Sequence, residues 1–169
     1  EMVGKKYGSK PCDTYVDYRD LCARDDLDVV IVATPDHWHA VQALEALRNG
    51  KDIYCEKPIT HFFAEGQALY REVAKRKAIF QTGSQQRSAT VFRNAVELVR
   101  NGLIGKVKEV QGGLPKGPDK VKGDPTEEDR SGREDYQLWT GPAPMLPYVH
   151  ARHHQMWRVH LAYGGGLLM

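Results

Sequence analysis

The sequence of 169 residues predicts an α/β fold with a parallel sheet. Three short runs rich in apolar and β-branched residues, 28–33, 51–55 and 78–82, are separated by segments with helical periodicity. Alternation of strands and helices at this spacing implies parallel strands joined by right-handed crossovers. The first run is apolar on both faces, which predicts a partial sheet with helices on both faces.

Helices are predicted before and between these strands. Residues 15–24 form one, capped by Asp17, and residues 37–49 form the next, which stops at Gly50. A third helix takes Thr60 as its N-cap and runs to about Arg76. The apolar side chains of the two longer helices are spaced as a buried stripe requires. They are Val41, Leu44 and Leu47, and Phe62, Leu69 and Val73.

A second domain is expected to begin after the third strand. Its first elements are a helix over residues 88–101 and a half-buried strand over residues 106–113, the start of an α/β domain with an open sheet. The boundary is placed near residue 86, dividing the chain into 1–86 and 87–169. The helix is predicted to turn four side chains inward. These are Val91, Ala95, Val96 and Val99.

The remaining segments read as connections. Residues 115–135 are rich in charge and predict a surface loop, and residues 138–148 carry three prolines, which predict an extended segment rather than a helix. The chain begins at Glu1, not methionine, and ends just after the triplet Gly164–Gly166. These ends predict a fragment of a longer protein.

Composition narrows the range of partners. Lys and Arg number 24 against 22 Asp and Glu, so the net charge of +2 supplies no basic field for nucleic acid. No apolar run approaches the ~20 residues of a membrane helix, so no membrane partner is expected. Cys12, Cys22 and Cys55 form neither a zinc spacing nor a disulfide framework. They favour a reducing compartment, the cytoplasm, with the periplasm left open.

Polar residues follow all three predicted strands. The segments are 34–39 (Thr-Pro-Asp-His-Trp-His), 56–58 (Glu-Lys-Pro) and 83–87 (Gly-Ser-Gln-Gln-Arg). Carboxyl ends of parallel strands share one edge of a sheet, where ligands of open α/β folds bind. Together the segments predict a binding site there. Lys57 is the strongest candidate for a catalytic residue, because a lysine at a strand end is suited to proton exchange with a substrate hydroxyl. The alternative is a surface lysine before a rigid proline turn.

These motifs resemble the Gfo/Idh/MocA oxidoreductases, the family of glucose–fructose oxidoreductase and inositol dehydrogenase. The resemblance also rests on segments 101–106 (Asn-Gly-Leu-Ile-Gly-Lys), 138–144 (Leu-Trp-Thr-Gly-Pro-Ala-Pro) and 164–166 (Gly-Gly-Gly), which occur in the family's order. It implies a Rossmann domain, then a domain with a large open sheet. It further implies NAD or NADP as cofactor, hydride transfer to or from a sugar or polyol, and a homo-oligomer paired through the C-terminal sheet.

The resemblance also assigns residues. Lys57 matches the family's catalytic lysine, which contacts the cofactor and substrate and serves proton transfer. The other residues matching the cofactor side are Thr34, Pro35, His39, Glu56 and Gln85. Trp157 and Arg158 match a segment near the substrate. The glycine-rich loop G-x-G-x-x-G and the family's later Asp and His are absent. The chain alone is therefore expected to bind cofactor weakly and to be inactive.

Other readings stay open. A family member without catalysis would bind a sugar or a partner, and a glycosidase or lyase that uses nicotinamide would run on the same scaffold. His37 and His39, or His150, His153 and His154, are candidate metal ligands. No carboxylate or cysteine completes either set at a metal spacing, so no metal site is predicted.

Overall fold

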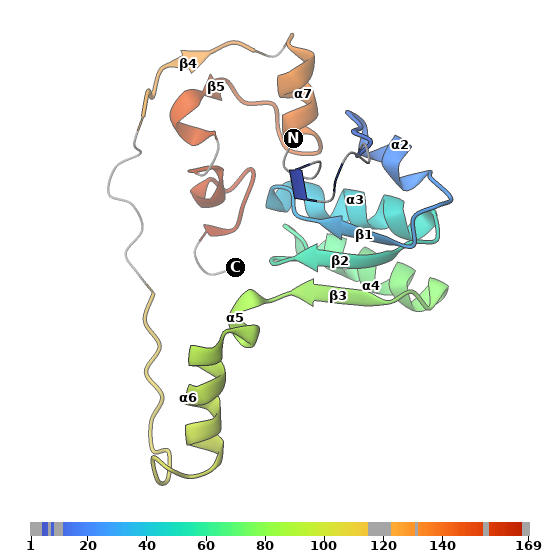
Figure 1. Cartoon of the computed structure of the whole chain (residues 1–169). Coiled ribbons are helices and arrows are strands. Elements are labelled where there is room, and N and C mark those ends of the chain that lie inside the picture. The colour runs from blue at the N-terminus through green and yellow to red at the C-terminus, as the bar shows by residue number, and fades with distance from the viewer. Residues whose placement is uncertain are drawn as a thin grey trace.

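The structure, a computed structural model, centres on a three-stranded parallel sheet (Figure 1). Its strands β1 (Val29–Val32), β2 (Asp52–Glu56) and β3 (Phe80–Gly83) lie in the order β1-β2-β3. Their carboxyl ends lie at the edge that faces the C-terminal part of the chain. This confirms the predicted fold class. The described residues are 5–6, 8, 12–114, 123–130, 132–153 and 156–166.

Three helices accompany the sheet at the predicted places: α2 (Tyr18–Cys22), α3 (Asp36–Arg48) and α4 (Phe63–Arg76). Asp17 caps α2 as predicted, its Oδ1 accepting the N–H of Arg19 at 2.9 Å, although the helix is shorter than expected.

The predicted N-cap of α4 is wrong. The helix begins after Phe62 instead of Thr60, because the Glu65 carboxylate accepts the backbone N–H groups of His61 and Phe62, both at 2.9 Å. A side-chain acceptor inside the first turn thus replaces a capping hydroxyl before it.

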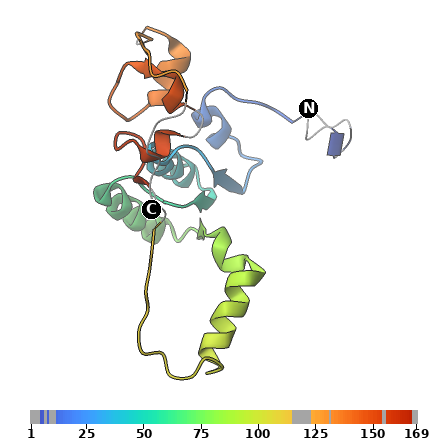
Figure 2. The same cartoon turned by 90° about the vertical axis from the view of Figure 1, so that its left-hand side faces the viewer.

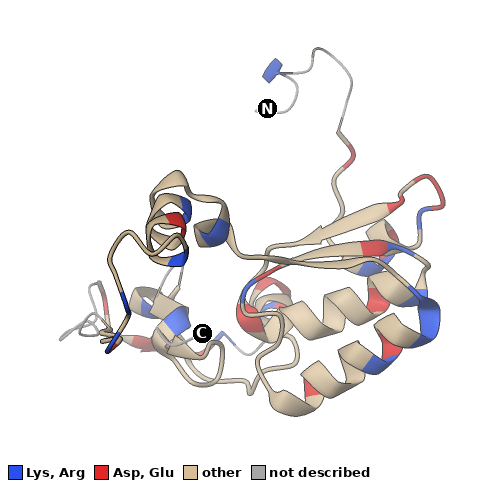
Figure 3. Cartoon of the chain, turned by 90° about the horizontal axis from the view of Figure 1, so that it is seen from below, with Lys and Arg blue, Asp and Glu red and all other residues tan. Residues whose placement is uncertain are grey.

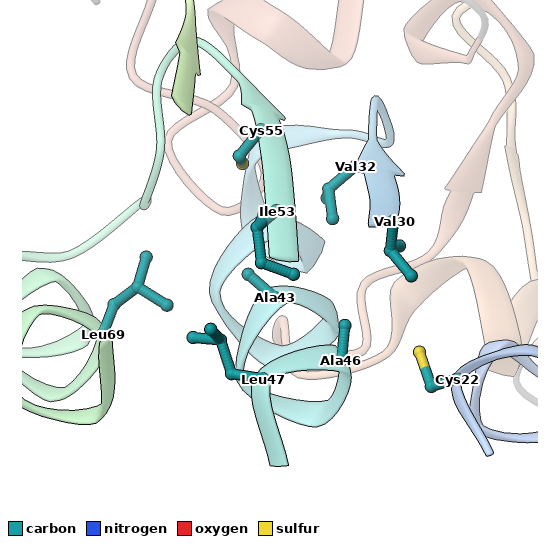
Figure 4. Close-up of a cluster of buried hydrophobic side chains, with 9 residues drawn as sticks. All are labelled: Cys22, Val30, Val32, Ala43, Ala46, Leu47, Ile53, Cys55 and Leu69. Carbon is teal, nitrogen blue, oxygen red and sulfur yellow. The ribbon is translucent and has the colours of Figure 1, made fainter. Parts of the chain in front are cut away.

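The core lies on one face of the sheet (Figure 4). Alternate residues of β1 point away from it, with Val29 54% and Ile31 70% exposed. The predicted second layer of helices is therefore absent among the described residues. Two successive right-handed crossovers in one direction along a sheet place both helices on the same face, so α3 and α4 lie together. The buried residues of this core are Cys22, Val30, Val32, Ala43, Ala46, Leu47, Ile53, Cys55 and Leu69.

The buried face of α3 consists mainly of alanines. Ala43, Ala46 and Leu47 are fully buried, whereas the predicted Val41 and Leu44 are only half-buried. Small side chains let a helix approach a sheet closely, which a search for large apolar residues does not detect. In α4 the prediction holds for Leu69 and for half-buried Val73, but Phe62 precedes the helix and is exposed.

After β3 the chain leaves the sheet. Two helices follow, α5 (Gln85–Ser88) and α6 (Thr90–Arg100), and α6 projects away from the remainder in both views (Figures 1 and 2). Helix α6 matches the predicted helix, but the burial of its apolar face was wrongly predicted. Val91, Ala95, Val96 and Val99 are all exposed. The predicted half-buried strand over residues 106–113 is wrong. These residues are exposed and form no strand, and no described segment pairs with them.

The last part of the chain folds back toward the sheet. Helix α7 (Glu134–Thr140) is followed by β5 (Tyr148–Val149), which pairs antiparallel with β4 (Glu127–Glu128). The prediction of an extended segment over 138–148 is wrong for residues 138–140. Gly141, at φ +50°, ends α7, and all three prolines come after it.

Two short 3₁₀ helices, η1 (His150–Arg152) and η2 (Met156–Val159), complete the chain. The charged-loop prediction for residues 115–122 falls outside the described residues, as does residue 131. No helix in the described ranges is long and apolar enough to cross a bilayer. The domain boundary near residue 86 stays a prediction.

Candidate functional site

The polar turns after the three strands meet at one edge of the sheet. Val32 pairs with Cys55, and Glu56 pairs with Gly83, so the chain leaves all three strands side by side. The predicted cofactor-side residues of these turns are Thr34, Pro35, Glu56, Lys57 and Gln85. The structure thus brings together segments that are 20 residues or more apart in sequence.

Glu56 lies directly against the backbone of β3. A Cβ atom on Gly83 would stand 2.8 Å from the Glu56 Cδ, closer than such atoms approach in proteins. Gly83 therefore leaves space for the Glu56 carboxyl group at the end of the sheet.

Lys57 is exposed on the turn after β2, where its peptide bond to Pro58 is cis. The imidazole of His39 bridges this turn to the turn after β1. Its Nδ1 lies 2.5 Å from the Pro58 carbonyl oxygen, and its Nε2 lies 2.7 Å from the Thr34 carbonyl oxygen. The ring is 1% exposed, so its nitrogens face protein atoms. His39 joins the turns, and direct contact of its ring with a cofactor stays a prediction.

His37 makes a similar bridge to a different part of the chain. Its Nδ1 lies 3.2 Å from the Tyr163 carbonyl oxygen and its Nε2 3.0 Å from the Trp139 carbonyl oxygen. The His37 backbone N–H also points to Tyr163 O, at 3.3 Å. Burial lowers the pKa of His37, although the two carbonyls act in the opposite direction. The sequence placed His37 in the polar segment 34–39 and suggested a role for it only as a metal ligand. Its closeness to His39 in that segment was the available signal for a second bridging histidine.

Two glycines allow the C-terminal segment to dock on the start of α3. A Cβ on Gly141 would lie 2.1 Å from Cζ2 of Trp38, whose indole Nε1 donates to the Trp139 carbonyl at 3.0 Å. A Cβ on Gly164 would lie 2.9 Å from the Arg158 carbonyl oxygen, within the segment itself, and 3.1 Å from Oδ2 of buried Asp36. Together with His37, these contacts hold the described part of the C-terminal segment, residues 134–153 and 156–166, against the strand-end turn that carries Pro35.

A cavity of about 400 Å³ lies where this segment meets the sheet edge. Trp157, predicted on the substrate side, lines it together with Pro35, predicted on the cofactor side. Arg158 is exposed, and its guanidinium lies over the Trp157 ring at 4.5 Å. The structure therefore places Trp157 in the cavity wall, whereas Arg158 does not line the cavity. The other lining residues are Arg130, Asp135, Tyr136, Trp139, Tyr148 and His153.

The described residues contain no group of three or more His, Cys, Asp or Glu residues placed to hold a metal ion. The nitrogens of His37 and His39 face carbonyl oxygens instead. His154 lies outside the described residues.

Comparison with known proteins places the sheet region in a family. Residues 2–84 match the Gfo/Idh/MocA family model, described as an oxidoreductase family with an NAD-binding Rossmann fold. A curated relative, 2,7-anhydro-N-acetylneuraminate hydratase from Mediterraneibacter gnavus, is 33% identical over 57% of this chain and 26% of its own length. Inositol 2-dehydrogenase from Rhodococcus jostii is 33% identical over 59% of this chain and 28% of its own length.

A solved structure of a dehydrogenase resembles the fold of this chain. Scyllo-inositol dehydrogenase from Lactobacillus casei, with bound NAD(H) and scyllo-inositol, superposes with a TM-score of 0.50 at 31% identity. The match covers 53% of this chain and 26% of that chain. This chain spans about a quarter of the length of the relatives it matches.

The parallel sheet, its crossover helices and the polar turns at its carboxyl edge define a Rossmann-type nucleotide-binding domain. Over residues 2–84 the chain matches the Gfo/Idh/MocA family of oxidoreductases.

Proposed function

We propose that the protein carrying this chain is an oxidoreductase that uses NAD or NADP and transfers hydride to or from a carbon of a sugar, polyol or related alcohol. The observation that carries the proposal is the meeting of Thr34, Glu56 and Lys57 at the carboxyl edge of the sheet, in a chain that matches this family. Ligands of open α/β sheets bind at this edge.

The residues at this edge are proposed to contact the cofactor between its adenosine part and its nicotinamide. Thr34 and Pro35 follow β1, Glu56 and Lys57 end and follow β2, and Gln85 begins α5. The sequence has no G-x-G-x-x-G loop to hold the pyrophosphate, so these residues line only part of a cofactor site. When bound, the nicotinamide supplies or accepts the hydride.

Lys57 is the proposed proton-transfer group. Its side chain is exposed on the turn that joins the sheet edge to α4. An amine at this place accepts the proton of a substrate hydroxyl when that carbon loses hydride, and returns the proton in the reverse direction. Trp157 and Arg158 are proposed to act on the substrate side, where Trp157 and Pro35 share a cavity.

Substitution of Lys57 in the intact protein tests the proposal. We expect Lys57→Ala to lower the rate of hydride transfer by ~10²–10⁴-fold, with a smaller effect on cofactor affinity. Lys57→Arg does not restore the rate, because a guanidinium stays protonated. The measurement is single-turnover reduction of NAD or NADP with a panel of cyclic polyols and aldoses. Lys75→Ala, an exposed lysine near the end of α4, is the control. An unchanged rate in Lys57→Ala refutes the proposed role.

A second candidate function is a reaction with no net redox change, such as elimination or hydrolysis. The relative whose name is a hydratase favours it. The same panel distinguishes the two, because a dehydrogenase accumulates reduced cofactor in proportion to product, whereas a lyase or glycosidase forms product without net reduction. If neither is formed, the reading as a non-catalytic sugar- or partner-binding protein is favoured. Pairing of the intact protein through its C-terminal sheet stays a prediction.

A further inference from the structure

We propose that His39 is a positioning residue that fixes the turn carrying Lys57 relative to the turn after β1. The catalytic consequence of this role rests on the proposed function, whereas the structural bridge does not. The buried His39 ring contacts the backbone of both turns, so it would affect the reaction through the position of Lys57 rather than by touching substrate.

The bridge is short and direct. The ring contacts the carbonyl of Pro58, the residue after Lys57, at 2.5 Å, and the carbonyl of Thr34 at 2.7 Å. Both contacts are carbonyl oxygens, which only accept hydrogen bonds. A neutral ring donates its single N–H to one of them, whichever tautomer it adopts, and only the doubly protonated ring donates to both. With 1% of the residue exposed, water does not substitute for these contacts.

The helix that carries His39 is a rigid reference. Ala43 and Leu47, one and two turns further along α3, are fully buried in the core. Gln42 fixes the same loop from the next turn, because its Oε1 accepts the Thr34 hydroxyl at 3.0 Å. His39 therefore links the turn that carries Lys57 to a core helix.

His37 offers a matched comparison. It lies two residues away on the same helix, is 2% exposed and also bridges two backbone carbonyls. Those carbonyls belong to Trp139 and Tyr163, in the C-terminal segment. Removal of either buried imidazole is expected to lower the stability of the whole fold. The segment that becomes more mobile differs, because His39 contacts the turn at Pro58 and His37 contacts the C-terminal segment.

Hydrogen exchange of backbone amides tests the bridge without any need for activity. We expect His39→Gln to speed exchange of the backbone amides of Lys57, Ile59 and Thr60 by about tenfold or more, and to leave those of residues 139–153 and 156–163 unchanged. His37→Gln is expected to do the reverse. Equal acceleration of both segments, or no change in residues 57–60 in His39→Gln, overturns the proposal.

A measurement on the unsubstituted protein covers the case in which His39→Gln fails to fold. Nitrogen-15 NMR of the ring is expected to show a His39 N–H that exchanges slowly with water. A ring N–H that exchanges as fast as in free histidine overturns the bridge.

The catalytic consequence is tested by a double substitution in the intact protein. His39→Gln is expected to lower the single-turnover rate by up to about 10²-fold, as misplacement of a reacting group does. In the Lys57→Ala background it is expected to add almost nothing, because it acts through Lys57. Additive losses overturn the positioning role. If the intact protein reduces neither cofactor with any substrate, the proposed function fails, and hydrogen exchange alone still decides the bridge.

Discussion

The sheet region and the region after it use similar sequence patterns with different results. In residues 18–83 the apolar side chains on one face of the sheet pack against those of its helices and form one core. In α6 a comparable stripe remains uncovered, with Val91 79% and Val96 52% exposed. The two regions differ because the strands and helices of the sheet region pack against elements that lie close to them in sequence. No described element buries the apolar stripe of helix α6 in this way. An amphipathic helix forms from local pattern, but its burial depends on an element elsewhere.

The C-terminal segment is neither held by an apolar core, as the sheet region is, nor left uncovered, as α6 is. It docks on the start of α3 mainly through backbone carbonyls and aromatic rings. His37 and Trp38 both bond to the Trp139 carbonyl, and the His37 and Tyr163 rings lie 5.3 Å apart. Polar and aromatic contacts of this kind fix one orientation of the segment, whereas an apolar stripe alone tolerates sliding. Acidic and basic residues both occur along the helices in view (Figure 3).

The largest expected effect separates the sheet core from α6. Leu47→Ala removes a fully buried side chain and is expected to lower the free energy of unfolding by roughly 2–5 kcal/mol. Val96→Ala, on the exposed face of α6, is expected to change it by about 0.5 kcal/mol or less. Urea denaturation followed by circular dichroism measures both. Equal losses would show that the α6 face is covered in solution.

A smaller effect is expected where the C-terminal segment meets α3. Gly141→Ala places a methyl group in the Trp38 ring and requires a positive φ, so we expect a loss of about 1–3 kcal/mol. Gly132→Ala is the control, since a Cβ there meets no atom within 4 Å. Thermal unfolding compares the two variants. A stable Gly141→Ala protein with unchanged Trp fluorescence would contradict the docked arrangement.

The smallest expected effect is a pH dependence of the same docking. Because burial lowers the pKa of His37, the unfolded chain binds a proton below about pH 6.5 more readily than the folded chain does. The free energy of unfolding should therefore fall as pH drops through that value. His61 lowers the pKa further and Asp36 raises it, but desolvation is the largest cause.

Denaturation at pH values on either side of about 6.5 measures this dependence. We expect His37→Gln to lose less stability on acidification than the unsubstituted chain. An identical loss in both proteins would assign the dependence to other groups, among them His160, whose pKa is also lowered by burial.

The strand-end site was largely predictable because it follows from topology. Once three parallel strands were predicted in succession, their carboxyl ends had to share an edge, so Thr34, Glu56 and Lys57 had to gather there. The contacts within the site were not predictable. Nothing in the sequence shows that His39 turns toward Pro58 while His37 turns toward Trp139.

The sequence by itself determined the strands, the crossover helices and the family motifs, because these follow from local periodicity and short-range spacing. Only the tertiary structure decided which faces are covered. It left one face of the sheet and the stripe of α6 exposed, and it formed no strand over residues 107–114. Burial and strand pairing require a partner that local sequence does not specify. For the same reason, the two histidines of one helical turn acquired different roles only when distant carbonyls came within reach of their rings.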